Sequence, residues 1–161
     1  MNNPNKEIIL KNLKASQFFD NSGINIKVIK RDPELDYPLH HHDFYELVYI
    51  ISGKGIHFTQ EEQQQLRRGD VFCIVPGFFH GYKNCDNLVI YNILIRAAFI
   101  DSSSFDVKKM KGFKELFLPP RNTFGRLHLS SPQRAAAESM IETLKSETEN
   151  HSETYGTETK S

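Results

Sequence analysis

The sequence has 161 residues, which is enough for one domain with a proper core and too short for two comfortable ones. Twenty basic side chains (Lys and Arg) balance twenty acidic ones (Asp and Glu), so the net charge is about zero. This argues against nucleic-acid binding by these residues alone, because affinity for phosphate backbones needs clustered positive charge. No apolar run predicts a membrane span, and the polar N-terminus lacks the apolar stretch of a secretion signal. Two cysteines without metal-type spacing favour a reducing, cytoplasmic setting.

The first part of the chain predicts an arm followed by strands. Residues 1–23 are polar at first and then carry a mixed apolar patch, so we expect an N-terminal arm that packs onto the body of the domain. Alternating apolar and polar residues over 24–28 predict a strand. The stretch 39–51 predicts a long strand, and the glycine-rich stretch 52–55 predicts a turn into a second strand over 56–59.

The middle of the chain continues this pattern and then changes character. A short buried strand is expected over 71–75, and residues 83–87 read as a polar turn. The run 88–96 is rich in branched residues and strongly favours a strand. Apolar residues over 105–118 have a spacing that predicts one or two short helices, and a last strand is expected over 125–129.

The C-terminal part predicts one amphipathic helix. Ser131 suits the N-cap position and Pro132 the first helical position. An apolar stripe at i, i+3, i+4 and i+7 carries this helix to about residue 149. We therefore expect three parts: an arm (1–23), a β-barrel (24–129) and a helical region (130–161). Many short strands followed by helices imply an antiparallel β-sandwich or jelly roll with a helical appendix.

A cluster of polar side chains stands out near residue 40. His40, His42 and Glu46 are separated by even numbers of residues, so on a strand all three side chains face the same way. An antiparallel neighbour would bring His80 opposite them, whereas His41 has the other parity and lies outside the cluster. Three imidazoles and a carboxylate suit a divalent Zn, Ni, Fe, Mn or Co ion. The alternative is that these groups form hydrogen bonds with one another, with water or with a sugar.

Two spacings around this cluster resemble the motifs of the cupin family. His40-x-His42-x-x-x-Glu46, then six residues and a glycine, resembles the first motif. The stretch 69–77, followed by His80, three intervening residues and Asn84, resembles the second motif. Pro76 directly precedes its glycine, where the family has one residue between them. The resemblance implies a mainly β fold, the cupin double-stranded β-helix or jelly-roll barrel, here with C-terminal α-helices.

A longer match is similar to the ligand-sensing domain of AraC-family transcription regulators, the rhamnose-responsive branch especially. It rests on P-L-H-H-H-D-F-Y-E-L-V-Y-I-I-S-G-x-G, then G-D-V-F-x-I-x-P-G, then D-N-L-x-I-Y-N-I-L, and covers roughly residues 10–150. The family's two helix-turn-helix units are absent from these residues. The resemblance therefore implies a piece of a longer regulator or a stand-alone sensor, with DNA as a partner only through the absent part. It also implies pairing of two copies through the helix at 132–149.

The expected barrel suits one small metabolite, and a carbohydrate is favoured. Phe44 shares the inward parity of Glu46, Tyr82 shares that of His80, and Asn92 is polar on a largely apolar strand. We predict that these five residues bind the ligand. Phe44, like Phe72 and Phe78, has a plainer interpretation as a core residue, and the isolated His57 is interpreted as structural or exposed.

Three functions remain open from the sequence. The first is an effector-sensing domain whose ligand shifts the placement of the DNA-binding units. The second is a metal-dependent cupin enzyme of the dioxygenase or sugar isomerase type, for which no separate acid, base or nucleophile is found. The third is a barrel whose polar cluster is a relic without a ligand.

Overall fold

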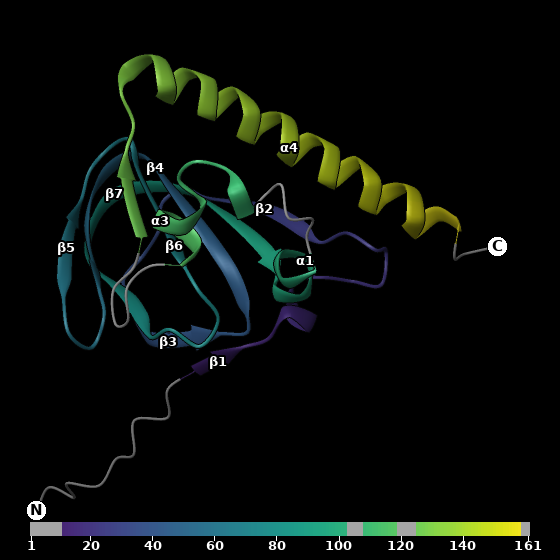
Figure 1. The fold of residues 1–161 in the computed structure, drawn as a ribbon, viewed down its shortest axis with the longest axis horizontal. Coiled ribbons are helices and arrows are strands. Elements are labelled where there is room, and N and C mark those ends of the chain that lie inside the picture. Colours follow the sequence, from purple (N-terminus) through teal and green to yellow (C-terminus); the bar gives the residue numbers. More distant parts are fainter. Residues whose placement is uncertain (1–10, 103–107, 119–124, 159–161) are drawn as a thin grey trace, which may run out of the picture.

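In the computed structural model, the described residues form eight strands, which build a mainly β fold with a long helix on one side (Figure 1). The structure describes residues 11–102, 108–118 and 125–158, with the backbone alone for 151–158. The strands are β1 (Lys11–Leu13), β2 (Ile26–Arg31), β3 (Tyr37–His42), β4 (Phe44–Phe58), β5 (Gln63–Leu66), β6 (Asp70–Ile74), β7 (His80–Arg96) and β8 (Gly125–His128). The helices are the 3-10 turn η1 (Ala15–Gln17), α1 (Ala97–Asp101), α3 (Phe113–Phe117) and α4 (Ser131–Glu158). The expected fold class is confirmed.

The two longest strands, β4 and β7, form the centre of the sheet. They pair with each other in antiparallel fashion, and the strand order runs β1-β3-β7-β4-β6-β8. The first residues of β7 lie between β3 and the end of β4, whereas residues 90–95 lie between β2 and the beginning of β4. Because β7 changes neighbours along its length, the inward side chains of β2, β3, β4 and β7 surround one interior.

Both central strands continue through segments that the sequence predicts as turns. The predicted turns at 52–55 and 83–87 are wrong, because β4 and β7 stay paired across them with register shifts typical of β-bulges. Residues in the left-handed region supply the bend: Gly53 has φ +82°, Asn84 +54° and Asn87 +46°. Glycine and asparagine therefore curve the strands here without ending them.

Helix α4 covers the outer face of the sheet over β2 (Figure 1). Ile141 on α4 is buried and packs with Val28 of β2 and with Tyr49, Tyr91 and Ile93 of the central strands. The hydroxyl of Tyr49 also donates a hydrogen bond of 2.6 Å to Glu138 Oε1 on the helix. A second group of apolar side chains fills part of the interior: Val48, Ile50, Leu66, Phe72, Ile74, Leu88 and Ile90.

The arm and the short helices are described only in part. Residues 1–10 and 105–107 lie outside the described residues, and α3 (Phe113–Phe117) falls within the stretch predicted as short helices. Within 11–23, β1 pairs in parallel with β3, and Phe19 is buried. The division into arm, barrel and helical region stays a prediction. Among the described residues, no helix is long and apolar enough to cross a membrane.

Candidate functional site

The predicted polar cluster comes together in the interior, from three strands. His40 and His42 lie on β3, Glu46 on β4 and His80 on β7, and all four are buried. The register explains their meeting, because His40 lies directly opposite His80 on the neighbouring strand. Alternation along β3 and β4 keeps the even-numbered residues on the inner face, as expected. The ring of His41 instead lies against Phe79, at 4.6 Å between centroids.

Three of these residues form a compact group. One ligand atom each from His42, Glu46 and His80 lies within 4.8 Å of the others, which is a group that could hold a metal ion. His42 Nε2 lies 3.0 Å and His80 Nε2 3.6 Å from Glu46 Oε2. Neither nitrogen has a hydrogen-bond partner among the residues that the structure describes. His40 lies beside this group, with its ring 4.3 Å from that of His80, and its part in a metal site stays a prediction.

The ring orientation of His42 makes this group suitable for a cation. His42 Nδ1 lies 2.6 Å from the carbonyl oxygen of Phe44, and because a carbonyl oxygen only accepts, Nδ1 carries the proton. In neutral His42 the lone pair of Nε2 therefore faces the Glu46 carboxylate, and two acceptors at this distance need a proton or a metal ion between them. A backbone carbonyl that accepts from the second nitrogen is also the usual partner of a metal-binding histidine.

His57 belongs to this cluster, although the sequence does not place it there. It is fully buried, so the exposed alternative is wrong, and its Nε2 lies 3.2 Å from His80 Nδ1. Burial lowers the pKa of His57 to about 3 and lowers the pKa of His80 well below its usual value, with the neighbouring histidines as a smaller cause. Burial likewise lowers the pKa of His40. The interior therefore favours neutral imidazoles.

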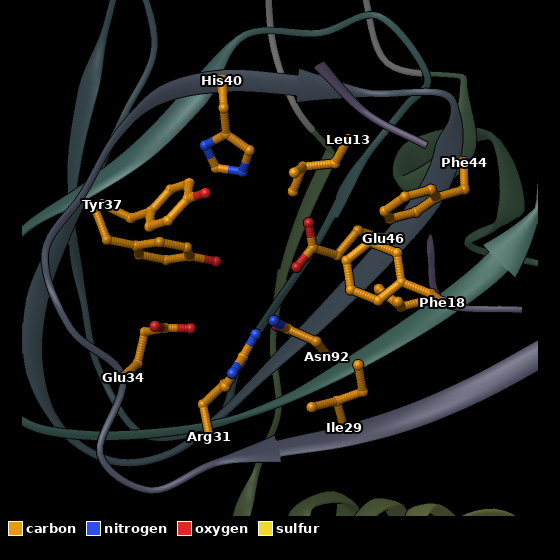
Figure 2. A pocket seen from close by; sticks show the side chains of 12 residues that line it. Leu13, Phe18, Ile29, Arg31, Glu34, Tyr37, His40, Phe44, Glu46 and Asn92 are labelled. Atoms are coloured by element: carbon orange, nitrogen blue, oxygen red, sulfur yellow. The ribbon is translucent and has the colours of Figure 1, made fainter. Parts of the chain in front are cut away.

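A cavity of about 170 Å³ lies next to the cluster, because His40 and Glu46 belong to its lining (Figure 2). It is smaller than the roughly 300 Å³ at the lower end of pockets for drug-sized ligands, so it suits a compound of monosaccharide size. Its walls come from the arm, from β2, from the loop after β2 and from β3, β4 and β7. The lining residues are Leu13, Phe18, Ile29, Arg31, Glu34, Tyr37, His40, Phe44, Glu46, Tyr82, Asn92 and Leu94.

Two buried polar groups in this lining have no hydrogen-bond partner among the residues that the structure describes. The hydroxyl of Tyr82 and Oδ1 of Asn92 make no hydrogen bond with any described residue, although both side chains are more than nine-tenths buried. A buried polar group without a partner is costly, so it calls for a water molecule or a ligand. Burial raises the pKa of Tyr82 well above its usual value, so its hydroxyl keeps its proton and can donate.

Four of the five predicted ligand-binding residues line the cavity: Phe44, Glu46, Tyr82 and Asn92. His80 is not among the lining residues, and its Nε2 lies 3.6 Å from Glu46 Oε2. The roles of all five stay predictions. Phe72 and Phe78 pack with the interior apolar group, in agreement with their interpretation as core residues.

The sequence prediction misses Phe18, Arg31, Glu34 and Tyr37, which also line the cavity. Arg31 shares a face of β2 with the apolar Ile29, but alternation alone does not single out this face, because Ile26 and Val28 make the other face apolar too. The sequence gives no comparable signal for the loop residue Glu34 or for Phe18 in the arm.

Comparison with known proteins adds a family and several relatives. The profile of the family described as "AraC-like ligand binding domain" matches residues 26–159. The HTH-type transcriptional activator RhaS of Escherichia coli O81 (strain ED1a) is 34% identical over 85 residues, which is 53% of this chain and 31% of that protein. RhaS of Yersinia pestis (strain Pestoides F) gives the same identity and coverage. The matched region thus spans about a third of the length of these relatives.

Solved structures of cupins are also similar in part. A cupin-like protein from Thermotoga maritima has a TM-score of 0.43 and 23% identity, covering 48% of this chain and 62% of that chain. An RmlC-like cupin from Shewanella frigidimarina has a TM-score of 0.40 and 20% identity, covering 45% and 68%. Likeness at this level says nothing about a ligand or an activity.

Proposed function

Because the chain belongs to the family of AraC-like ligand-binding domains, we propose that it senses a small metabolite, a sugar, for a cytoplasmic transcription regulator. Occupancy of the cavity would be passed to helix-turn-helix DNA-binding units outside these 161 residues, so DNA is a partner only through them. The observation that carries the proposal is the small cavity in which the Tyr82 hydroxyl and Oδ1 of Asn92 are buried without a hydrogen-bond partner among the described residues.

The walls of the cavity support a sugar. Phe18 and Phe44 stand edge to face at 5.4 Å between centroids and give the cavity an aromatic wall. Glu46 and Asn92 offer acceptors for hydroxyl groups, and Tyr82 offers a donor. An aromatic face together with a few convergent polar groups is what a pyranose ring requires.

A thermal-shift screen tests this proposal. Pentoses, deoxyhexoses and uronic acids are added to the 161-residue chain, and a binding sugar raises the apparent stability by about 2.7 kcal/mol at a hundredfold excess over Kd. Asn92→Leu removes the amide at nearly constant volume and should abolish the shift. Asn12→Leu, at an exposed position of β1, is the control and should retain it. A panel in which no sugar shifts the melting temperature contradicts the proposal.

A metal-dependent cupin enzyme is the second candidate, and the group of His42, Glu46 and His80 favours it. These residues would hold a divalent transition metal ion (Zn, Ni, Fe, Mn or Co), which would supply a Lewis acid beside the cavity. Metal analysis of protein purified without an affinity tag tests the site. Stoichiometric metal, together with turnover that disappears with a chelator and with Glu46→Ala, would favour the enzyme over the sensor.

Pairing of two copies through the helix at 132–149 is also proposed. In α4 (Ser131–Glu158), Ile141 packs against the barrel and does not belong to the outward face. On the outward face the large apolar side chain that the structure exposes is Met140. Pairing through this helix would therefore rest on few apolar contacts.

A further inference from the structure

The cavity has a polar half and an apolar half (Figure 2). On one side lie Arg31 at the end of β2, Glu34 in the loop, and Tyr37 and His40 on β3. On the opposite side lie Leu13, Phe18, Ile29 and Phe44. Glu46 and Asn92 stand between the two halves. A ligand that fills this space presents charged or hydroxyl groups to one wall and carbon to the other.

Arg31 is an exposed residue that also lines the cavity, and it supplies the positive charge of the polar half. Its guanidinium is directed into the cavity (Figure 2), and no carboxylate oxygen of a described residue lies within 4.0 Å of it. Arg31 acts on the pKa of Glu34 only through longer-range attraction. The preceding residue, Lys30, has the opposite parity and lies over the ring of Tyr91, at 5.9 Å. Arg31 therefore lines the cavity, whereas Lys30 lies on the outer face of the sheet.

The two carboxylates of the lining leave this charge available. Glu46 lies against His42 at 3.0 Å and is directed to the histidine cluster. Glu34 forms no ion pair with Arg31 within 4.0 Å, and burial is the main cause that raises its pKa. An arginine that faces a cavity without an ion partner is suited to a planar carboxylate, which its guanidinium binds through two parallel hydrogen bonds.

We propose that the effector is a sugar acid, a monosaccharide-sized carboxylate whose carboxylate group pairs with Arg31. The inference rests on the proposed sensor function and names the ligand class of the same cavity. The hydroxyl groups of the ligand would meet Glu46, Tyr82 and Asn92, and its carbon face would lie against Phe44. A sugar phosphate fits less well, because its second negative charge would find no further Lys or Arg among the described lining residues.

Matched sugar pairs test the proposal on the full 161-residue chain. Calorimetric titration compares glucose with glucuronate, galactose with galacturonate and mannose with mannuronate, at constant ionic strength and neutral pH. One acid should bind at least roughly tenfold more tightly than its neutral partner, as expected for a charged hydrogen-bonded pair. Arg31→Gln should remove this preference, so that the variant binds an acid and its neutral partner with similar affinities. Arg31→Lys should restore part of it.

Lys30→Gln is the matched control, since it removes one positive charge from the adjacent position without touching the cavity. It should leave the affinity for the acid unchanged. Equal losses in Lys30→Gln and Arg31→Gln would show a general charge effect and overturn the inference. Neutral sugars that bind as well as their acids would overturn it and leave the proposed sensor intact, whereas a panel in which nothing binds would overturn both.

Discussion

At the scale of single residues, the backbone carbonyl of Phe44 sets the orientation of His42 in the group of His42, Glu46 and His80. By accepting a hydrogen bond from His42 Nδ1, the Phe44 carbonyl forces the lone pair of neutral His42 toward Glu46. The cluster thus brings together a carboxylate and imidazole nitrogens that hydrogen bonds with described residues do not satisfy. Such an arrangement suits the binding of a cation better than the packing of an ordinary protein core.

Glu46→Gln tests this arrangement. The new amide can donate to His42 Nε2, which removes the clash between two acceptors. We expect the free energy of unfolding of the metal-free protein to stay the same or to rise by about 1 kcal/mol. Affinity for Zn²⁺ or Ni²⁺ should fall at least roughly tenfold, because loss of the negative ligand weakens the site. Urea unfolding and metal titration measure the two effects, and a large loss of stability in the metal-free protein would contradict this interpretation.

The buried histidines make stability depend on pH. The pKa of His57 falls from 6.5 to about 3 on folding, and the pKa of His80 also falls, so below pH 6.5 the unfolded chain binds more protons than the folded chain. This contribution to stability is complete above pH 6.5 and is lost as the pH falls toward 3, at up to about 1.4 kcal/mol per pH unit for each histidine.

Urea unfolding at a series of pH values checks this dependence, with His57→Gln as the comparison. The variant should show a shallower decline over the same range, because one titrating group is gone. Parallel curves of stability against pH for the two proteins would show that the pKa of His57 does not change on folding.

At the scale of elements, the residues of β4 that face the interior change from even to odd numbers along the strand. Its even-numbered residues from Phe44 to Ile50 point inward, and after the bulges the odd-numbered Gly55 and His57 are buried instead. The bend depends on Gly53, where an added Cβ would collide with the carbonyl oxygen of Asn87 on β7. The bulge thus turns His57 toward His80.

Gly53→Ala should therefore lower the free energy of unfolding by much more than the strain of its positive φ alone. Gly23 has the same φ of +82° but no atom within 4 Å of an added Cβ, so Gly23→Ala reports only the strain, about 1–2 kcal/mol. We expect Gly53→Ala to lower the free energy of unfolding well beyond that value, as measured by urea unfolding. Equal losses in the two variants would show that the bulge can open to make room.

The difference between predicted and observed site also arises at this scale. Strict alternation over short distances correctly places His40, His42 and Glu46 on the inner face of their strands. It fails for His57, which is 11 residues from Glu46 and would face outward on an unbroken strand. Bulges reverse the parity between them, and their number is set by long-range pairing with β7 rather than by local sequence. Glu34 is missed for a similar reason, since a loop has no periodicity.

Helix α4 is attached to the barrel through few large side chains. Ile141 is buried against the sheet, whereas the adjacent Met140 is 66% exposed. Ile141→Ala should lower the free energy of unfolding by about 2–4 kcal/mol, because it leaves a cavity between helix and sheet. Met140→Ala should change it by less than about 0.5 kcal/mol. Thermal unfolding of both variants checks the pair, and a neutral Ile141→Ala would show that α4 is only loosely docked.

At the scale of the whole molecule, association of two copies depends on what α4 leaves exposed. If pairing occurs through its outward face, Met140→Glu should shift the chain toward monomer and leave the stability of the monomer unchanged. Sedimentation velocity over a concentration series measures this shift, with Ser139→Glu as the control for added charge. A chain that sediments as a monomer at every concentration before any substitution would contradict the pairing.

The central place of β7 also bears on how the polypeptide is made. β2, β3 and β4 all pair with residues 80–96, so during translation these three strands emerge from the ribosome before their shared partner exists. Among the described strands, the pairing of β1 with β3 and the pairings of β4 with β5 and β6 can form earlier. The nascent chain must therefore keep its apolar N-terminal strands from aggregating until Arg96 has left the exit tunnel.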